Sequence, residues 1–538
     1  MLAQLNALAA SERLSGRDNR RGLRLPGRRV IVLLAITALT LGVVSATDGS
    51  AQADDEWGKP VTVDSTFQEY GINPTIAMAK DGSKALAVWR SNDIHAAWWT
   101  PSGWSEVTRL GEGGFDSDTT PSVALSADGS KAVVVWDRAD EEDPVPSYYS
   151  VQWVQWTGTA WTPQTTLAAD AKQSTVSMSA DGSTTVAAWA HRERKIRARI
   201  MTGSGWEAQR TVATAPHTAR YPDVSVAAHA AGEAVLSWSE GRRVATAHLS
   251  GGTWSAGWKG PRRSKVLPPS VELSANGSRA FLVWWYYQTT SEPETVGAAV
   301  WKRGRWARDK GIGSQHSVYS KEHYPLSLAV SSSGKKAYAM WTTRSAGKSG
   351  IISSRWKKGS WSKSAKAGKG VHPQVGLAGG EATALWRGEW NAEHSVRTKA
   401  TSGSAWQDYQ KIGQASWWEP VSFALAGDGG TGMAVWGQDG LAKASLLQRY
   451  GMAKKVKAKV SKKSAKKSKA KITWKQPGYA TGAKVKLSKP DKEKFSSWKT
   501  VSKPKYAKTV KRGKKYWVKI KVTTPAGHGP AVTKSFQS

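Results

Sequence analysis

The sequence predicts an all-β protein made of repeated four-stranded units, followed by a smaller β domain. A segment centred on Asp-Gly, Pro121–Trp136, recurs with the same spacing as Pro74–Trp89 and Pro269–Trp284. Its closing tryptophan recurs at intervals of about 50 residues, a period typical of propellers and other repeat arrays. The repeats also lack the 3.6-residue periodicity of helical arrays, which leaves strands as the repeated element.

Each Asp-Gly segment is predicted to form a hairpin. Apolar and small residues alternate on both sides of Asp128-Gly129, and both turn residues tolerate positive φ. A tryptophan at one phase of every repeat is expected to pack between neighbouring units, where its large ring buries most area. We therefore assign a structural role to the closing tryptophans Trp89, Trp136, Trp189, Trp238, Trp284, Trp341, Trp386 and Trp436.

Two further strands complete each unit. An opening strand begins at a second phased tryptophan, as at Trp57 and Trp104, and a fourth strand such as Ile94–Trp99 ends at a short Gly-bearing turn. Four antiparallel strands repeated around a centre form a β-propeller. Eight openings and eight hairpins predict eight blades over residues 54–451. A seven-bladed ring with one detached unit is the alternative.

The composition changes abruptly after residue 452. A Lys-rich linker is expected over residues 452–469, and a second domain over residues 470–538. This domain resembles a fibronectin type III domain through Trp474, Tyr516 with Val510 six residues before it, and the closing Gly527-His-Gly-Pro530. The resemblance implies a β-sandwich in which the tyrosine hydroxyl serves packing rather than chemistry.

The repeat region resembles the secreted, sialidase-like propellers of actinobacteria and related bacteria. The likeness rests on the Pro-x-Val-Ala-x-Ser-x-Asp-Gly hairpin and on the two phased tryptophans. The tryptophans also resemble those that dock neighbouring blades in eight-bladed quinoprotein dehydrogenases. Both resemblances imply the fold but not an activity. The hairpin differs from the sialidase Asp-box, which has a residue between Asp and Gly.

Residues 1–53 are predicted to be a signal peptide. Arginines including Arg28 and Arg29 precede the apolar run Val30–Val44, and Ala51-Gln-Ala53 supplies a cleavage site. The apolar run is short for a spanning helix, so an uncleaved membrane anchor is the less favoured alternative. The mature protein is expected to be secreted and extracellular, beginning near Asp54, and the absence of cysteine is compatible with this location.

The formal net charge of +37 is unevenly distributed. About +25 of this charge lies after residue 452, where the sequence contains 26 lysines and one arginine but only two acidic residues. Such density predicts binding to an anionic cell-wall polymer, lipid surface or extracellular DNA through released counterions, and a solvated linker is the alternative. The lysines look scattered rather than interleaved with aromatic rings, so sequence-specific nucleic-acid recognition is not expected. The residues chosen for polyanion binding are Lys454, Lys455, Lys462, Lys463, Lys466 and Lys467.

Aromatic residues outside the repeat phase are candidates for ligand binding. The long connections between strands should gather at one end of the propeller, where binding residues tend to lie. Rings flanked by polar groups suit stacking on sugars, although they could equally cover loop backbone. The candidates are Tyr70, Tyr149, Trp285, Tyr286, Tyr287, Tyr324, Trp390, Trp417 and Trp418.

No catalytic residue, metal site or cofactor is predicted. Two acidic segments, Asp116-Ser-Asp118 and Asp140–Asp143, lack the spacing of a calcium loop. We expect a monomeric, non-catalytic binding or adhesion protein whose partner is an extracellular glycan or cell-wall polymer. The alternatives are a sialidase-like glycoside hydrolase and a scaffold for a protein partner. The polar residues that a hydrolase would bring near the axis are Arg90, Asp137, Arg387 and Glu419.

Overall fold

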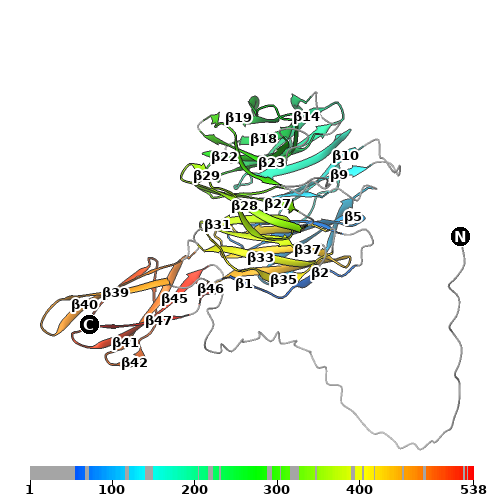
Figure 1. Ribbon diagram of the computed structural model, residues 1–538. Helices are drawn as coiled ribbons and strands as arrows, with labels where there is room; N and C mark the ends of the chain where they lie inside the picture. The colour runs from blue at the N-terminus through cyan, green and yellow to red at the C-terminus, as the bar shows by residue number, and fades with distance from the viewer. Residues whose placement is uncertain are drawn as a thin grey trace, which may run out of the picture. The chain divides into compact units, whose positions relative to one another are not determined.

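Figure 1 shows the computed structural model of the chain. It describes residues 55–66, 72–114, 120–139, 149–203, 205–215, 222–229, 232–287, 294–302, 304–315, 326–345, 348–388, 394–402, 405–416, 419–450, 454–476, 480–524, 527–529 and 531–538. The described residues form β-strands and no α-helix. The predicted signal peptide lies outside them.

The described residues between 55 and 449 form eight antiparallel sheets, numbered here along the chain. Sheet 1 contains β3 (Asn73–Met78), β4 (Ala85–Arg90), β5 (Asp93–Thr100), β6 (Gly103–Trp104) and β7 (Thr108–Glu112). Sheet 2 contains β8 (Ser122–Leu125), β9 (Ala132–Ala139), β10 (Tyr149–Trp156) and β11 (Thr165–Ala169). Sheet 3 contains β12 (Ala171–Met178), β13 (Thr185–His191), β14 (Lys195–Thr202), β15 (Gly205–Trp206) and β16 (Arg210–Thr214). Sheet 4 contains β17 (Val224–His229), β18 (Glu233–Ser239), β19 (Val244–Ser250) and β20 (Thr253–Lys259).

The second four sheets repeat this order. Sheet 5 contains β21 (Lys265–Leu273), β22 (Arg279–Tyr287), β23 (Glu294–Lys302), β24 (Arg305–Trp306) and β25 (Lys310–Gln315). Sheet 6 contains β26 (Ser327–Val330), β27 (Lys336–Ser345), β28 (Lys348–Lys357), β29 (Ser360–Trp361) and β30 (Ala365–Lys369). Sheet 7 contains β31 (Val371–Ala378), β32 (Glu381–Arg387), β33 (Ser395–Ser402), β34 (Ala405–Trp406) and β35 (Gln410–Gln414). Sheet 8 contains β36 (Val421–Leu425), β37 (Thr431–Gln438) and β38 (Leu441–Arg449), together with β1 (Asp55–Trp57) and β2 (Val61–Asp64).

The sheets are offset by one strand from the units expected from the sequence. The strand after each opening tryptophan was expected to begin its own unit. In the structure β7, which follows Trp104, pairs with β5 and is the outer strand of the preceding sheet. The reason is local, because the short turn at Gly103 leads directly back along β5. By the same offset, β1 and β2 pair with β38 and complete the last sheet.

The sheets pack face to face through their second strands. Every residue of β4, and likewise of β13, is buried. A strand covered on both faces carries a continuous apolar run instead of an alternating one, as Ala-Val-Val-Val-Trp in β9 does. The eight closing tryptophans lie in these strands, and each exposes at most 3% of its surface.

A small residue in the preceding sheet makes room for each of several closing tryptophans. A Cβ atom added to Gly413 of sheet 7 would lie 2.4 Å from Trp436 Cζ2 of sheet 8. Gly368 stands in the same relation to Trp386, at 2.6 Å. Only glycine allows this approach of ring to backbone, so the tryptophans dock on the neighbouring sheet.

First strands of successive sheets contact one another, from β3 and β8 through to β31 and β36, and β36 contacts β3. Serine hydroxyls satisfy backbone groups across these edges. Ser122 Oγ accepts a hydrogen bond from Val176 N at 3.1 Å, and Ser327 Oγ accepts one from Val375 N at 2.9 Å. The arrangement of repeated, face-packed antiparallel sheets is that of a β-propeller.

The C-terminal residues form two sheets over one core. The first contains β39 (Lys454–Lys462), β40 (Lys467–Lys475) and β44 (Lys505–Lys511). The second contains β41 (Gly482–Lys489), β42 (Lys492–Phe495), β43 (Lys499–Val501), β45 (Lys515–Thr524), β46 (Gly527–His528) and β47 (Val532–Gln537). Trp474 and Tyr516 are buried in the shared core, and Tyr516 Oη accepts a hydrogen bond from Lys511 N at 3.0 Å.

The linker expected over residues 452–469 is not observed as a linker. Lys454–Lys462 form β39, which pairs along its length with β40. The reason is visible in the alternation of this segment, since Val456 and Ala458 pack against the domain core while lysines face outward. Composition suggested a flexible tract, but the period-two pattern specifies a strand.

Candidate functional site

Four buried polar side chains lie where the second strands end, away from the Asp-Gly turns; we call this the loop end. Arg90, Asp137 and Arg387 each follow a closing tryptophan, and none exposes more than 6% of its surface. Arg90 Nη2 donates to Gly114 O at 2.8 Å. The two oxygens of Asp137 accept from backbone N–H groups of sheet 3, at 2.7 and 3.0 Å.

The fourth side chain is Glu419. In sheet 8 it fills the space next to the residue that follows the closing tryptophan, because that residue is a glycine. Gly437 follows Trp436, and a Cβ at that glycine would lie 1.4 Å from Glu419 Oε2. Glu419 Oε1 accepts a hydrogen bond from Ile72 N at 2.8 Å, which joins the connection before β36 to the one before β3. Arg387 Nη1 donates to Glu419 O at 3.2 Å.

Burial raises the pKa of Asp137 and raises the pKa of Glu419 to about 7. A raised carboxyl pKa is also a property of catalytic acids. The hydrogen-bond partners of each carboxyl group are therefore needed to tell a structural role from a catalytic one. Arg90, Arg387 and Glu419 bond to backbone groups of the connections between sheets, and Asp137 bonds to backbone N–H groups of β12. These bonds link neighbouring strands and connections at the loop end.

Three of the predicted stacking rings are buried in cores. Tyr149 exposes 9% of its surface, and Trp285 and Tyr286 expose 3% each. Lys172 Nζ lies 4.1 Å from the centre of the Tyr149 ring, and Arg263 Cζ lies 4.4 Å from that of Tyr286. These rings present no open face for a sugar. The sequence placed them in a connection, whereas β10 and β22 extend to include them.

Of the remaining predicted rings, Tyr287 lies among the described residues. Tyr287 is half-buried at the end of β22, and its hydroxyl donates to Glu294 Oε1. The other candidates, Tyr70, Tyr324, Trp390, Trp417 and Trp418, lie outside the described residues.

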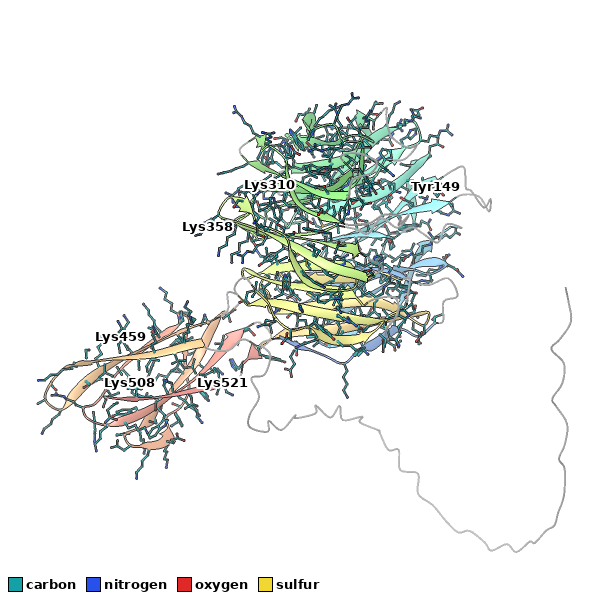
Figure 2. All side chains as sticks on the ribbon, in the orientation of Figure 1. Tyr149, Lys310, Lys358, Lys459, Lys508 and Lys521 are labelled. Atoms are coloured by element: carbon teal, nitrogen blue, oxygen red, sulfur yellow. The ribbon has the colours of Figure 1, made fainter. Side chains whose placement is uncertain are left out.

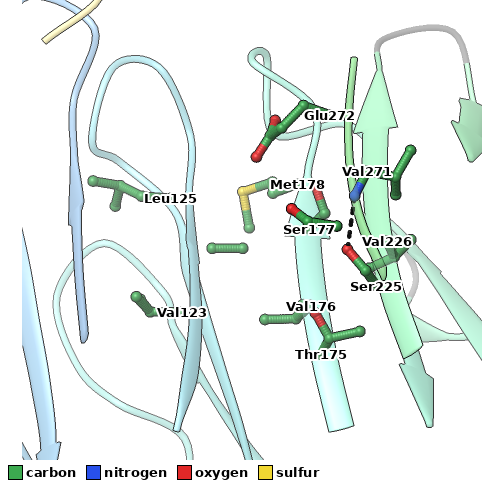
Figure 3. Close-up of a pocket in the computed structure, with 12 residues that line it drawn as sticks. Val123, Leu125, Thr175, Val176, Ser177, Met178, Ser225, Val226, Val271 and Glu272 are labelled. Atoms are coloured by element: carbon green, nitrogen blue, oxygen red, sulfur yellow. Dashed lines mark hydrogen bonds between the residues drawn. The ribbon is translucent and has the colours of Figure 1, made fainter. Parts of the chain in front are cut away.

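A cavity of about 350 Å³ lies between the first strands of sheets 2 to 5, and Figure 3 shows its lining. Glu272 of β21 projects into this space and is exposed to it. Desolvation by the surrounding protein raises the pKa of its carboxyl. Sequence reasoning missed this residue, although aligned repeats would have found it. The equivalent positions carry small residues: Ala77, Ala124, Ser177, Ala227, Ala329, Gly376 and Ala424.

The outer faces of both C-terminal sheets are covered by lysines, of which Figure 2 labels Lys459, Lys508 and Lys521. On the β39–β40–β44 sheet, Lys459 lies opposite Lys471, and Lys467 lies opposite Lys511. On the second sheet, Lys484 lies opposite Lys521, and Lys486 lies opposite Lys519. Like charges directly opposite on neighbouring strands are unfavourable.

Aromatic rings lie among the lysines of the second sheet, contrary to the expectation from sequence. Lys486 Nζ lies 4.5 Å from the ring centre of Trp498, and Lys519 Nζ lies 4.7 Å from that of Phe495. Lys521 Nζ also lies over Trp498. The strand pairing brings together residues that are distant in the sequence, so their scatter along the chain concealed this surface. Cation–π contact offsets part of the repulsion between the lysines.

The lysines chosen from the sequence occupy one edge of this domain. Lys455, Lys462, Lys463, Lys466 and Lys467 are exposed on β39, on β40 and on the turn between them, and Lys454 begins β39. The sequence missed the lysines of β41 and β45, because it did not indicate which strands pair.

Within the described ranges, no group of three or more His, Cys, Asp or Glu side chains is placed to hold a metal ion. Among the same residues, no helix has the length and apolarity needed to cross a membrane.

No protein-family model matches the chain, and no curated protein matches it. Solved structures of other proteins do align with the chain. A prolyl endopeptidase structure aligns with a TM-score of 0.40 and 12% identity, over 76% of this chain and 55% of that one. The chain thus spans about half of that enzyme.

Two further structures are covered almost entirely. The β-propeller domain of the Trilobed protease from Pyrococcus furiosus aligns with a TM-score of 0.38 and 10% identity, over 65% of this chain and all of that one. A fucose-specific lectin from Aleuria aurantia aligns with a TM-score of 0.36 and 11% identity, over 65% of this chain and 99% of that one.

Proposed function

We propose that the protein is an exported, non-catalytic binding protein held on an anionic cell-wall polymer by its C-terminal domain. The observation that carries this proposal is the set of like-charged lysine pairs on both sheets of that domain. Each pair costs stability in the free protein, and an external polyanion would convert this repulsion into attraction while releasing counterions.

The architecture that we propose for this protein is an eight-bladed propeller followed by a fibronectin type III domain. The contact between β36 and β3 and the pairing of β1 with β38 support closure of the eight sheets into a ring. The buried Trp474 and the hydroxyl of Tyr516, bonded to a backbone N–H, support the second assignment.

Polymer binding can be tested in the full chain by changing lysines to glutamine. A variant with Lys459, Lys467, Lys471 and Lys511 changed should bind purified wall teichoic acid more weakly. Its affinity should depend less on salt, with the slope of log K against log salt reduced by about three. Changing Lys302, Lys310, Lys363 and Lys366 in the propeller supplies a control of equal charge. Equal losses in the two variants would show that net charge, rather than this surface, determines binding.

Glycan recognition at the loop end of the propeller is the second part of the proposal. Its support is the sequence position of three tryptophans: Trp390 lies between β32 and β33, and Trp417 and Trp418 lie between β35 and β36. A glycan array probed with the full chain should show salt-insensitive binding that is lost in Trp417→Ala or Trp418→Ala. If no glycan binds, a scaffold for a protein partner replaces this part.

A further inference from the structure

A second basic site lies on the propeller itself, at the end of the sheets that carries the Asp-Gly turns. A cavity of about 480 Å³ is lined by Arg279, Lys335, Lys336, Lys357, Lys358 and Gly359. The lining comes from the start of β22 in sheet 5 and, in sheet 6, from the start of β27, the end of β28 and the turns next to them. Among the residues that the structure describes, five cationic side chains and no acidic one line this space.

Two of the five cations have structural partners. Arg279 Nη1 donates to Gly334 O at 2.6 Å, and Lys336 Nζ donates to Gly380 O at 3.0 Å. Lys131 makes the same bond to Gly182 O elsewhere in the propeller, so this contact belongs to the repeat. It fixes two positive charges at the wall of the cavity whether or not a ligand is present.

The other cations depart from the repeat. The third strand of a sheet ends in a hydroxyl residue at Thr100, Thr202, Ser250 and Ser402, whereas β23 ends at Lys302 and β28 ends at Lys357. Lys357 lies directly opposite Lys336, which adds a like-charged pair. The repeat therefore does not require a lysine at the end of the third strand. The repulsion between Lys357 and Lys336 also disfavours a lysine at this position.

The turn after β28 also differs from the equivalent turn of another sheet. Lys358 adopts φ +56°, a left-handed conformation that disfavours side chains, while the turn after β19 places Gly251 at φ +55°. A non-glycine residue in this conformation is strained, and such strain concentrates at functional sites. Lys358 is exposed and lines the cavity. Figure 2 labels it on the propeller.

We infer that this cavity binds a compact ligand with several tetrahedral oxyanion groups, such as phosphate or sulfate esters. Lysine ammonium groups and an arginine fork are the usual partners of these anions. A space of this volume suits a small molecule rather than a single ion. The site is separate from the lysine surfaces of the C-terminal domain and does not depend on the function proposed for them.

Residue-resolved lysine labelling of the full chain can test the site. The protein is acetylated with and without inositol hexakisphosphate, and mass spectrometry follows each lysine. We expect labelling of Lys335, Lys357 and Lys358 to slow at least about fivefold at near-saturating ligand, because occupied ammonium groups are shielded. Sucrose octasulfate in a second arm distinguishes a preference for phosphate from one for sulfate. Protection confined to lysines after residue 453 would overturn the inference and leave the C-terminal proposal intact.

Matched variants make the test specific. Lys357→Ser introduces a hydroxyl residue, as β19 and β33 have, and should reduce protection of Lys335 and Lys358 with an affinity loss of about tenfold. Lys302→Ser changes the corresponding lysine of sheet 5, which lies opposite Arg279 but does not line the cavity, and should cause a clearly smaller loss. Lys358→Gly removes a charge and the strain together, so it should bind more weakly while its melting temperature rises. Equal losses with Lys302→Ser would reduce the site to diffuse attraction by the basic surface.

Discussion

At the scale of the residue, single positions depart from the repeat for identifiable physical reasons. Gly413 and Gly368 leave space for a tryptophan ring of the next sheet, and Gly437 leaves space for the carboxylate of Glu419. None of these glycines is required by a turn. They show that close approach between sheets, rather than backbone conformation, selects the residue.

Gly413→Ala should destabilise the propeller by about 1–3 kcal/mol, because its new Cβ would overlap the Trp436 ring in a packed core. Urea unfolding followed by tryptophan fluorescence measures the change. Gly203→Ala is the matched control, since its Cβ would enter open space. Equal stability of the two variants would contradict the docking described for Trp436.

Glu419 makes a pH-dependent contribution to stability. Burial raises its pKa from the ordinary value of 4.5 to about 7 in the folded protein, because desolvation outweighs the hydrogen bonds from Ile72 and Ser416 and the charge of Arg387. As pH rises from 4.5 to 7, the unfolded chain loses this proton while the folded protein retains it. Stability should therefore fall over this window, by on the order of 3 kcal/mol.

Comparing Glu419→Gln with the unchanged protein isolates the contribution of the Glu419 carboxyl to the pH dependence of stability. The pKa of Glu272 is also raised, but this carboxyl is present in both proteins and its contribution cancels. The glutamine retains an oxygen for Ile72 N, so the variant should hold its stability between pH 4.5 and 7 while the unchanged protein weakens. Urea unfolding at several pH values measures the difference. Parallel curves would show that the Glu419 carboxyl titrates normally.

At the scale of the element, strand pairing converts patterns along the chain into surfaces. The lysines of β41 and β45 are scattered in the sequence but lie opposite one another in the sheet. The strand pattern Lys-x-Lys-x-Lys specified outward-facing charges in β39 as well, where composition alone suggested a linker. Periodicity was thus more informative than composition in this domain.

The Tyr516 hydroxyl offers a test of the C-terminal sandwich. Tyr516→Phe should cost about 1–2 kcal/mol, because it leaves the Lys511 N–H without its 3.0 Å acceptor beside a buried ring. Tyr506→Phe is the control, since its hydroxyl makes no hydrogen bond within the described ranges. Thermal unfolding of the full chain measures both, and an effect of Tyr506→Phe as large as that of Tyr516→Phe would argue against a specific corner bond.

At the scale of the whole molecule, the N-terminal strands complete the last sheet of the repeat region. β1 and β2 pair with β38 across nearly 400 residues of sequence, as in Asp55 opposite Arg449. Backbone bonds between the Asp-Gly turns also link neighbouring sheets. Asp428 N of sheet 8 donates to Lys80 O of sheet 1, and Lys80 N donates to Ala127 O of sheet 2. Contacts this distant in sequence are slow to form, but they constrain every sheet between them.

Deleting residues 1–64 should destabilise the repeat region by about 3 kcal/mol or more, because it removes β1 and β2 and exposes the edge of β38. Differential scanning calorimetry of this variant is compared with a chain lacking residues 1–53 alone. An unchanged transition after the longer deletion would show that sheet 8 is stable without its outer strands.

The sequence by itself determined the repeat, its hairpins and the position of the tryptophans between sheets, because these depend on local turn chemistry and on period-two patterns. The buried roles of Tyr149, Trp285 and Asp137, the carboxyl in the cavity at Glu272, and the lysine surfaces were decided only by tertiary structure. Burial and pairing depend on which strands become neighbours. In a repeat protein that is a property of the assembled sheets, since each strand faces partners from another repeat.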